Sequence, residues 1–284
     1  MTLFALVRAL HFASLMTVFG ANVFLWRARE AGLTGKRQRN LIHLSALIAL
    51  VTACLWIGFV ASEMGDVYVP GLNLLADVAS KSYFGKVALW RFLLLLALCD
   101  SWFTPDLPGL RALVAGAALA MLGLTSHAAA AGGSEQFYLR AGVDAVHLLT
   151  AGFWTGGLVV LIFEVFAKPR DVPRLVALLR LFSRWGAVSV ALLIVAGALN
   201  GVFILDAPMP WSGPYVTWLA VKIVLAAAMV ALALTNRFGV LPALARGDKE
   251  AEYTIPLTVA AELACAMLIL LIVGFLGVMP PTQM

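Results

Sequence analysis

The hydrophobic pattern of the chain consists of long apolar runs separated by short polar segments. None of the runs alternates apolar and polar residues, as the strands of a membrane barrel do. Each is long enough to cross a bilayer as a helix, which takes about 20 apolar residues. Eight runs are found, at approximately residues 3–26, 41–62, 85–103, 110–131, 139–166, 179–205, 216–235 and 255–278. The pattern predicts an all-α integral membrane protein, a bundle of eight transmembrane helices.

The composition agrees with this fold class. Of the 284 residues, 62% are hydrophobic and 12% are charged, which is about half the charged share of soluble domains. A soluble enzyme, a secreted disulfide scaffold and a disordered chain are therefore excluded. The three cysteines stand in separate apolar runs without C-x-x-C spacing, so they predict neither disulfides nor zinc. No long polar segment interrupts the runs, and we expect residues 1–284 to form a single domain, with a short interfacial helix around residues 72–79 on the outer surface.

Basic residues gather in the connections after the first, fifth and seventh runs. Short cytoplasmic loops retain Lys and Arg, so these connections are expected on the cytoplasmic side. Eight crossings then place both termini in the periplasm of a bacterial inner membrane. The first run has its positive cluster after it and no small-residue cleavage site, so it is expected to remain as a helix. The same loops account for most of the net charge of +5, and nucleic-acid binding is not expected.

Histidines inside the apolar runs carry the functional argument, because ionisable groups at membrane depth commonly mark ligand sites or pathways. At about 1.5 Å per residue, His11 and His147 lie ~12 Å below the outer face and His127 lies ~6 Å below it. Three imidazoles from three helices therefore share the outer half of the membrane. Imidazole binds copper, zinc and iron. His43 lies near the cytoplasmic mouth and is assigned a structural role.

Further groups could complete a metal site around these histidines. Met16 offers a thioether, which favours Cu(I), and Glu63 with Met64 lies at the outer end of the second run; these are weaker candidate ligands. Asp144 precedes His147 by three residues, so both lie on one helical face. The carboxylate could orient the imidazole as an outer partner, and Trp154 continues that face.

Other polar and small residues are assigned structural roles. Lys222 and Glu262 could pair within the bundle, and Asn200 could form a hydrogen bond between helices. Arg91 and Glu164 have no recognisable partner in the sequence. Small residues predict close helix packing, namely Gly152, Gly156, Gly157 and Gly197. The chain has no Walker A motif, no G-x-G-x-x-G at a strand-to-helix turn and no H-E-x-x-H, and we do not expect an enzyme.

Several segments around these residues resemble the CopD/PcoD copper-resistance family of bacterial inner-membrane proteins. They include R-A-L-H-F-A at His11, T-S-H-A-A-A at His127 and V-H-L-L-T-A-G-F-W-T-G-G-L at His147. The likeness continues through L-R-L-F-S-R-W-G-A-V-S-V, A-G-A-L-N-G, Y-V-T-W-L-A-V-K-I-V-L and the N-R at Asn236, and is strongest over residues 140–241. The resemblance implies an eight-helix protein that moves copper across the inner membrane, with a CopC-like periplasmic copper-binding protein as a separate partner.

These observations favour a copper-handling permease or metal receptor. It would accept copper from the periplasmic side through a cluster of His11, His127 and His147. Two alternatives stay open. One is a b-type cytochrome with His11 and His147 as the axial ligands of haem b, and the other is a membrane assembly factor that binds no metal.

Overall fold

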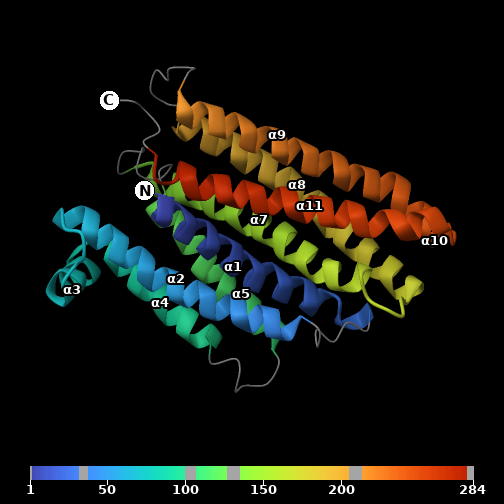
Figure 1. The fold of residues 1–284 in the computed structure, drawn as a ribbon, viewed down its shortest axis with the longest axis horizontal. Helices are drawn as coiled ribbons and strands as arrows, with labels where there is room; N and C mark the ends of the chain where they lie inside the picture. Colours follow the sequence, from blue (N-terminus) through green and yellow to red (C-terminus); the bar gives the residue numbers. More distant parts are fainter. Residues whose placement is uncertain (1, 32–37, 100–106, 127–134, 205–212, 280–284) are drawn as a thin grey trace.

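The computed structural model describes residues 2–31, 38–99, 107–126, 135–204 and 213–279, which form helices joined by short connections (Figure 1). No strand occurs in these ranges. The helices are α1 (Thr2–Arg27), η1 (Arg29–Ala31), α2 (Arg39–Gly65), α3 (Leu72–Lys81), α4 (Tyr83–Cys99), α5 (Pro108–Ala120), η3 (Met121–Thr125), α7 (Phe137–Val165), α8 (Val172–Ile204), α9 (Pro214–Thr235), η4 (Asn236–Val240), α10 (Leu241–Ala245) and α11 (Lys249–Leu276).

Seven helical segments in the described ranges are long and apolar enough to cross a membrane. They are α1, α2, α5 continued by η3, α7, α8, α9 continued through η4 and α10, and α11. Helices α3 and α4 meet at a bend of 94° and are an eighth candidate if the pair forms one broken span. The integral-membrane helical fold expected from the apolar runs is therefore confirmed.

Local sequence explains where several helices begin. Pro108 and Pro214 stand in the first turns of α5 and α9, where a missing backbone N–H removes no helical hydrogen bond. Asp248 caps α11 by accepting a hydrogen bond from the Glu250 backbone N–H at 2.8 Å. Glu250 and Glu252 in the first turn complement the positive end of the helix dipole.

Helix α1 is the centre of the bundle and packs against α7, α2, α5 and α11. Its crossing with α7 brings backbone against backbone. A Cβ added to Gly156 would lie 2.6 Å from the Gly20 Cα and 2.5 Å from the Ala21 nitrogen. Gly152 stands one turn earlier on the same face, so the expected role of these glycines in close packing is confirmed.

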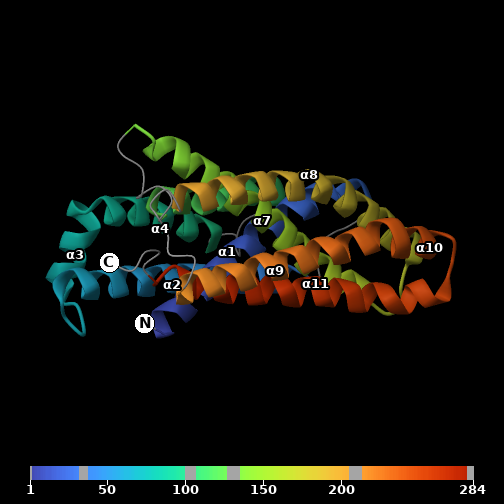
Figure 2. The same cartoon turned by 90° about the horizontal axis from the view of Figure 1, so that it is seen from above.

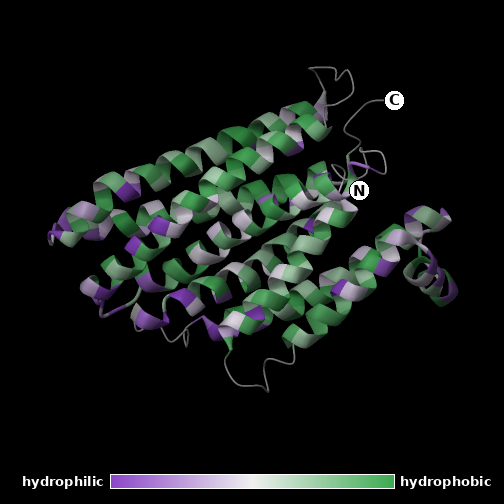
Figure 3. Ribbon diagram, turned by 180° about the vertical axis from the view of Figure 1, so that it is seen from behind, coloured by the Kyte–Doolittle hydropathy of each residue, from purple (hydrophilic) through white to green (hydrophobic). Residues whose placement is uncertain are grey.

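Hydrophilic residues are concentrated toward one end of the bundle (Figure 3). Polar residues gather around α10 and the connections next to it, including Arg170, Arg246 and Lys249. We call this the basic end. The first turns of α1 and the last turns of α11 lie together at the other end, because a Cβ added to Gly274 would meet the Ala5 backbone. We call this the terminal end.

Helix α3 lies at the terminal end and runs across the direction of α4 (Figure 2). It separates polar from apolar residues, as interfacial helices do. Leu72 is 84% exposed at its start, whereas Val78 is buried against the bundle. The short interfacial helix expected around residues 72–79 therefore forms, although its position relative to a membrane surface stays a prediction.

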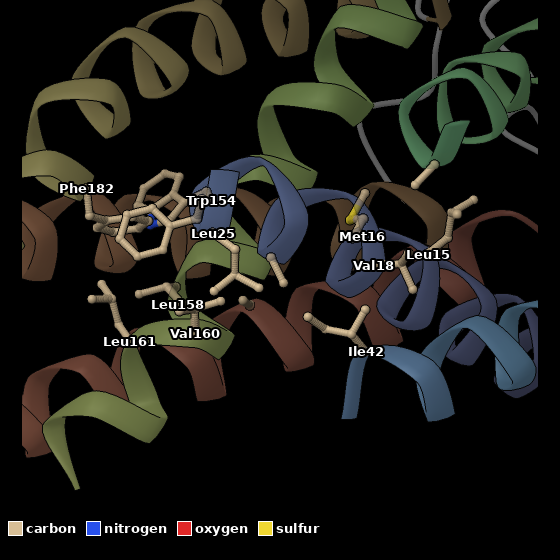
Figure 4. Packing of buried hydrophobic residues seen from close by; sticks show 14 of the residues in the cluster. Leu15, Met16, Val18, Leu25, Ile42, Trp154, Leu158, Val160, Leu161 and Phe182 are labelled. Carbon is tan, nitrogen blue, oxygen red and sulfur yellow. The ribbon is translucent and has the colours of Figure 1, made fainter. Parts of the chain in front are cut away.

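The core joins residues from both ends of the bundle (Figure 4). Leu15, Met16 and Val18 stand near the middle of α1, while Trp154, Leu158 and Phe182 form another part of the core. Phe182 of α8 fits against Gly157, where an added Cβ would lie 2.5 Å from its ring. The close-packing role expected for Gly157 is therefore confirmed.

Candidate functional site

A cavity of about 220 Å³ lies among α1, α7, α8, α9 and α11 toward the terminal end. We call it the His147 cavity. Aliphatic and aromatic side chains make most of its wall, and polar groups converge on it from α1, η3, α7, α8 and α9. Its polar and sulfur-containing lining residues are Arg8, Met16, Thr125, Ser126, Asp144, His147, Asn200, Tyr215 and Lys222. Apolar pockets with a few converging polar groups are the usual form of a ligand site.

His147 is the most suitable ligand in this cavity. It lies ten residues into α7, about 15 Å from the start of the helix. Its Nδ1 atom is buried and has no hydrogen-bond partner. Buried polar atoms are nearly always bonded, so a nitrogen without a partner beside a cavity is available to a ligand. An unprotonated imidazole nitrogen is also a common metal ligand.

Gly197 of α8 makes room for this imidazole. A Cβ added at Gly197 would lie 3.3 Å from Nδ1 and 3.2 Å from Cε1 of His147. Those distances are shorter than ordinary van der Waals contact, so any larger residue would push the ring. Gly197 was expected to serve close helix packing, and its closest neighbour is the imidazole of His147.

Asp144 and Asn200 form a hydrogen-bonded pair next to His147. Asn200 Nδ2 donates to Asp144 Oδ1 at 2.8 Å, which confirms Asn200 as a link between helices. Asn200 Oδ1 is buried and has no partner. The carboxylate is thus bonded to Asn200, and no hydrogen bond joins it to the His147 imidazole. Its expected role in orienting that imidazole is not supported by a direct contact.

Met16 also lines the cavity, from α1. It is 2% exposed and belongs to the hydrophobic core. The cavity therefore presents an imidazole nitrogen, a thioether sulfur and amide and carboxylate oxygens. Imidazole and thioether are ligands that suit copper, so this donor set fits the metal expected from the sequence.

His11 lies in a different environment from His147. Its side chain is fully buried, and Nδ1 is 2.9 Å from Thr52 Oγ1 and 3.1 Å from the Ala49 carbonyl oxygen. Arg91 of α4 donates a hydrogen bond to Nε2. Because a guanidinium only donates, Nε2 is the acceptor and Nδ1 carries the proton. Both nitrogens of His11 are therefore engaged in contacts between α1, α2 and α4.

Arg91 contacts the Trp56 ring in addition to His11. Its guanidinium lies 5.6 Å from the Trp56 ring centroid, and that of Arg8 lies 4.3 Å from the same centroid. Aromatic faces stabilise buried cations at such distances. The sequence offered no partner for Arg91 and drew no attention to Arg8, although an arginine three residues before His11 in an apolar run is itself a signal.

The remaining candidate ligands are dispersed. Glu63 and Met64 are exposed at the end of α2 and do not line the His147 cavity. His127 lies outside the described residues. Within the ranges that the structure describes, no three His, Cys, Asp or Glu side chains are grouped so that they could hold a metal ion. Copper binding by His11, His127 and His147 together stays a prediction.

A second cavity, of about 210 Å³, lies nearer the basic end between α7, α8, η4 and α11. We call it the Glu262 cavity. Trp154 Nε1 donates to Glu262 Oε2 at 3.3 Å, and Trp154 lines this cavity. It was expected beside His147, but it does not line the His147 cavity. The expected pairing of Lys222 with Glu262 is wrong, because Lys222 lines the His147 cavity. The two residues lie on α9 and α11 at different heights.

Glu164 has partners that the sequence did not reveal. Its Oε1 accepts a hydrogen bond from Gln38 at 2.9 Å, and its Oε2 lies 3.5 Å from Arg174 Nη2. These contacts join the end of α7 to the residues before α2 and to the start of α8. Glu164 therefore has a structural position at the basic end.

The chain matches two family models and two curated relatives. Residues 1–137 match the family model described as copper resistance protein D-like, N-terminal domain, and residues 176–276 match copper resistance protein D. The chain is 29% identical to copper resistance protein D of Pseudomonas syringae pv. tomato, over 97% of this chain and 96% of that relative. It is 26% identical to inner membrane protein YebZ of Escherichia coli K12, over 97% of both chains. No solved structure matches. The chain belongs to the CopD family of copper-resistance membrane proteins.

Proposed function

We propose that this protein accepts copper from the periplasmic side into the His147 cavity and passes it through the inner membrane. The observation that carries the proposal is the unpartnered Nδ1 of His147, which shares a cavity with the Met16 thioether. The names of the relatives, copper resistance protein D and an inner membrane protein, are consistent with copper as cargo. The proposal assigns no catalysed reaction to the chain.

The proposed direction depends on the orientation of the bundle. The basic end carries the connections rich in Lys and Arg, which face the cytoplasm in most inner-membrane proteins. The terminal end, with the His147 cavity, would then face the periplasm. Because α1 starts and α11 finishes at that end, the number of crossings must be even. An eighth crossing, by α4 after its bend from α3, satisfies this condition.

The charges of the cavity suggest how a cation could be accommodated there. Arg8 and Lys222 carry positive charge, and Asp144 supplies the carboxylate. Like charges repel strongly in a medium of low polarity, so a bare copper cation would be repelled by Arg8 and Lys222. We expect copper to enter by ligand exchange. Copper delivered by a CopC-like periplasmic protein could pass directly from donor ligands to His147 and Met16. The bare ion would then never occupy the cavity without ligands.

The haem alternative has less support. Its axial pair requires Nε2 or Nδ1 of His11, and each already has a partner in Arg91, Thr52 or Ala49. Haem binding would have to break these buried contacts. We therefore do not adopt it, and the metal-free assembly factor is kept as an outcome of the experiment.

The test uses the purified full-length chain, loaded with Cu(I) under reducing conditions and washed with a competing chelator. We expect retained copper in the unaltered protein. His147→Ala and Met16→Leu should each weaken binding by roughly tenfold or more, since removing even a partner of a ligand has such effects. Copper is measured by mass spectrometry of the metal, together with an optical spectrum that would reveal haem.

Two substitutions serve as matched controls. His43→Ala removes an imidazole near the start of α2, and Met229→Leu removes a buried thioether of α9 that does not line the His147 cavity. Both should retain copper as the unaltered protein does. Equal retention in all four variants would show that copper binds elsewhere, and no retention in the unaltered protein would support the assembly factor.

A further inference from the structure

Glu262 is buried near the middle of the longest apolar run of α11, with 2% of its surface exposed. Both carboxylate oxygens accept hydrogen bonds from neutral groups. Asn236 Nδ2 donates to Oε1 at 2.6 Å, and Trp154 Nε1 donates to Oε2 at 3.3 Å. In the described ranges no Lys or Arg nitrogen lies within 4.0 Å of this carboxylate. Buried carboxylates are usually paired with a cation, so Glu262 requires another explanation.

The charged neighbours of Glu262 are few. Arg237 of η4 lines the same cavity, but its Nη1 donates to the Ser183 carbonyl at 2.7 Å. On the other helices packed against α11, Lys222, Asp144 and His147 line the His147 cavity, and α10 carries no charged residue. Arg8 and Arg27 of α1 lie near its two ends and Glu164 at the end of α7, and none of them lines the Glu262 cavity.

Asn236 can serve Glu262 in either protonation state. Its Nδ2 donates to the carboxylate, while its Oδ1 is buried and has no partner. An amide carries both donors and an acceptor, so rotation of the side chain would let Oδ1 accept a hydrogen bond from a carboxylic acid. The adjacent cavity gives the amide space to turn and water space to enter. The ionised and the neutral forms of Glu262 are therefore both satisfied.

The backbone around Asn236 is also unusual. Residues 236–240 form a π-helical turn between α9 and α10. Such turns widen a helix by one residue and occur frequently at functional sites. Here the turn begins at the residue that binds Glu262.

We propose that Glu262 is a proton-binding site, which takes a proton from water on the basic side of the bundle and returns it there or passes it on. The Oε1–H bond forms as a hydronium ion gives up a proton and becomes water, and it breaks when the proton returns to a water molecule. Chains of acidic side chains at membrane depth carry protons in many pumps and transporters. This inference does not depend on copper, because it rests on Glu262, Asn236 and Trp154 alone.

Infrared spectroscopy of the metal-free full-length protein tests the proposal. A protonated carboxyl group absorbs separately from a carboxylate, so a pH titration should show such a band that disappears as the pH rises. Glu262→Gln should remove the component of that band that belongs to Glu262, while the contributions of the other carboxyl groups, including Asp144 in the His147 cavity, remain. Glu164→Gln removes another buried carboxylate, one that faces Arg174, and should leave the band in place. A band that titrates equally in the unaltered protein and Glu262→Gln would refute the proposal.

A second measurement needs no variant. Dicyclohexylcarbodiimide adds to protonated carboxyl groups in apolar surroundings and forms a stable N-acylurea without a leaving group. Peptide mass spectrometry of the unaltered protein should locate the adduct on Glu262, with labelling that decreases as the pH rises. Absence of an adduct at every pH, or labelling that does not change with pH, would also refute the proposal. Both results are independent of whether the His147 cavity binds copper.

Discussion

His147 and Trp154 lie on the same face of α7, two helical turns apart, and each lines a different cavity. Seven residues correspond to about 10 Å along a helix and almost two full turns. One helix therefore carries the candidate copper ligand and the indole that binds Glu262.

Gly197→Val should impair copper binding without changing any ligand. The valine Cβ would already lie 3.2 Å from Cε1 of the His147 ring, and its methyl groups need further space. The imidazole must therefore turn away. We expect copper retention to fall toward the level of His147→Ala. Gly186→Val is the control, because Gly186 lies on the same helix with open space at its Cβ and does not line the His147 cavity. Full retention in Gly197→Val would show that the imidazole position is not critical.

His11 and Arg91 are expected to stabilise the fold as a pair. Removing either leaves a buried polar partner unsatisfied, which costs about 1–3 kcal/mol. A double-mutant cycle with His11→Ala and Arg91→Ala, measured by thermal unfolding in detergent, should give a favourable coupling energy. Copper retention should stay close to normal in His11→Ala protein that remains folded. A loss of copper in that variant would place His11 among the ligands, as the sequence suggested.

Trp154→Phe should make Glu262 easier to protonate. The indole N–H donates to the carboxylate and stabilises its ionised form, so its loss favours the acid. The carboxyl band in the infrared titration should therefore persist to higher pH than in the unaltered protein. Trp185→Phe changes a half-exposed indole outside this cavity and should leave the titration unchanged. A shift to lower pH in Trp154→Phe would contradict the assigned hydrogen bond.

Gly156→Ala should destabilise the protein although it is a small change. Its Cβ would lie within 2.6 Å of the Gly20 Cα, so α1 and α7 must separate, at a cost of about 1–3 kcal/mol. Gly142→Ala on the same helix meets no atom within 4 Å and should be neutral or slightly stabilising. Thermal unfolding of the two variants in the same detergent compares them directly.

The orientation can be tested with reporters that are active on one side of the membrane. Alkaline phosphatase fused to the C-terminus should be active, because the terminal end is expected in the periplasm. The same enzyme inserted after Gly247, in the connection before α11, should be inactive. The reverse pattern would place the His147 cavity on the cytoplasmic side and would reverse the direction of the proposed transport.

The positions of the helices could be predicted from the sequence because long apolar runs set their lengths. The run expected at residues 139–166 became α7, Phe137–Val165, and the run at 255–278 became α11, Lys249–Leu276. Both lengths follow from the thickness of the bilayer. The expectation of one domain over the whole chain stays a prediction.

The side-chain partners could not be predicted in the same way, because hydropathy does not fix the rotation of a helix about its axis. Asp144 and His147 share a helical face, yet the carboxylate bonds to Asn200 of α8. Lys222 and Glu262 have opposite charge, but they line different cavities. The π-helical turn at residues 236–240 gave no clear periodic signal in an apolar sequence. These features depend on which helices meet.

Most of the contacts that hold helix α9 lie along one of its sides. It packs chiefly against α11, and 6% of its most apolar window is buried inside the bundle. The same helix supplies Lys222 to the His147 cavity, and it leads into the turn that supplies Asn236 to the Glu262 cavity. If α9 tilted against α11, the ammonium group of Lys222 and the amide of Asn236 would move together, although they belong to different cavities. The glycine crossing of α1 and α7 would not have to move.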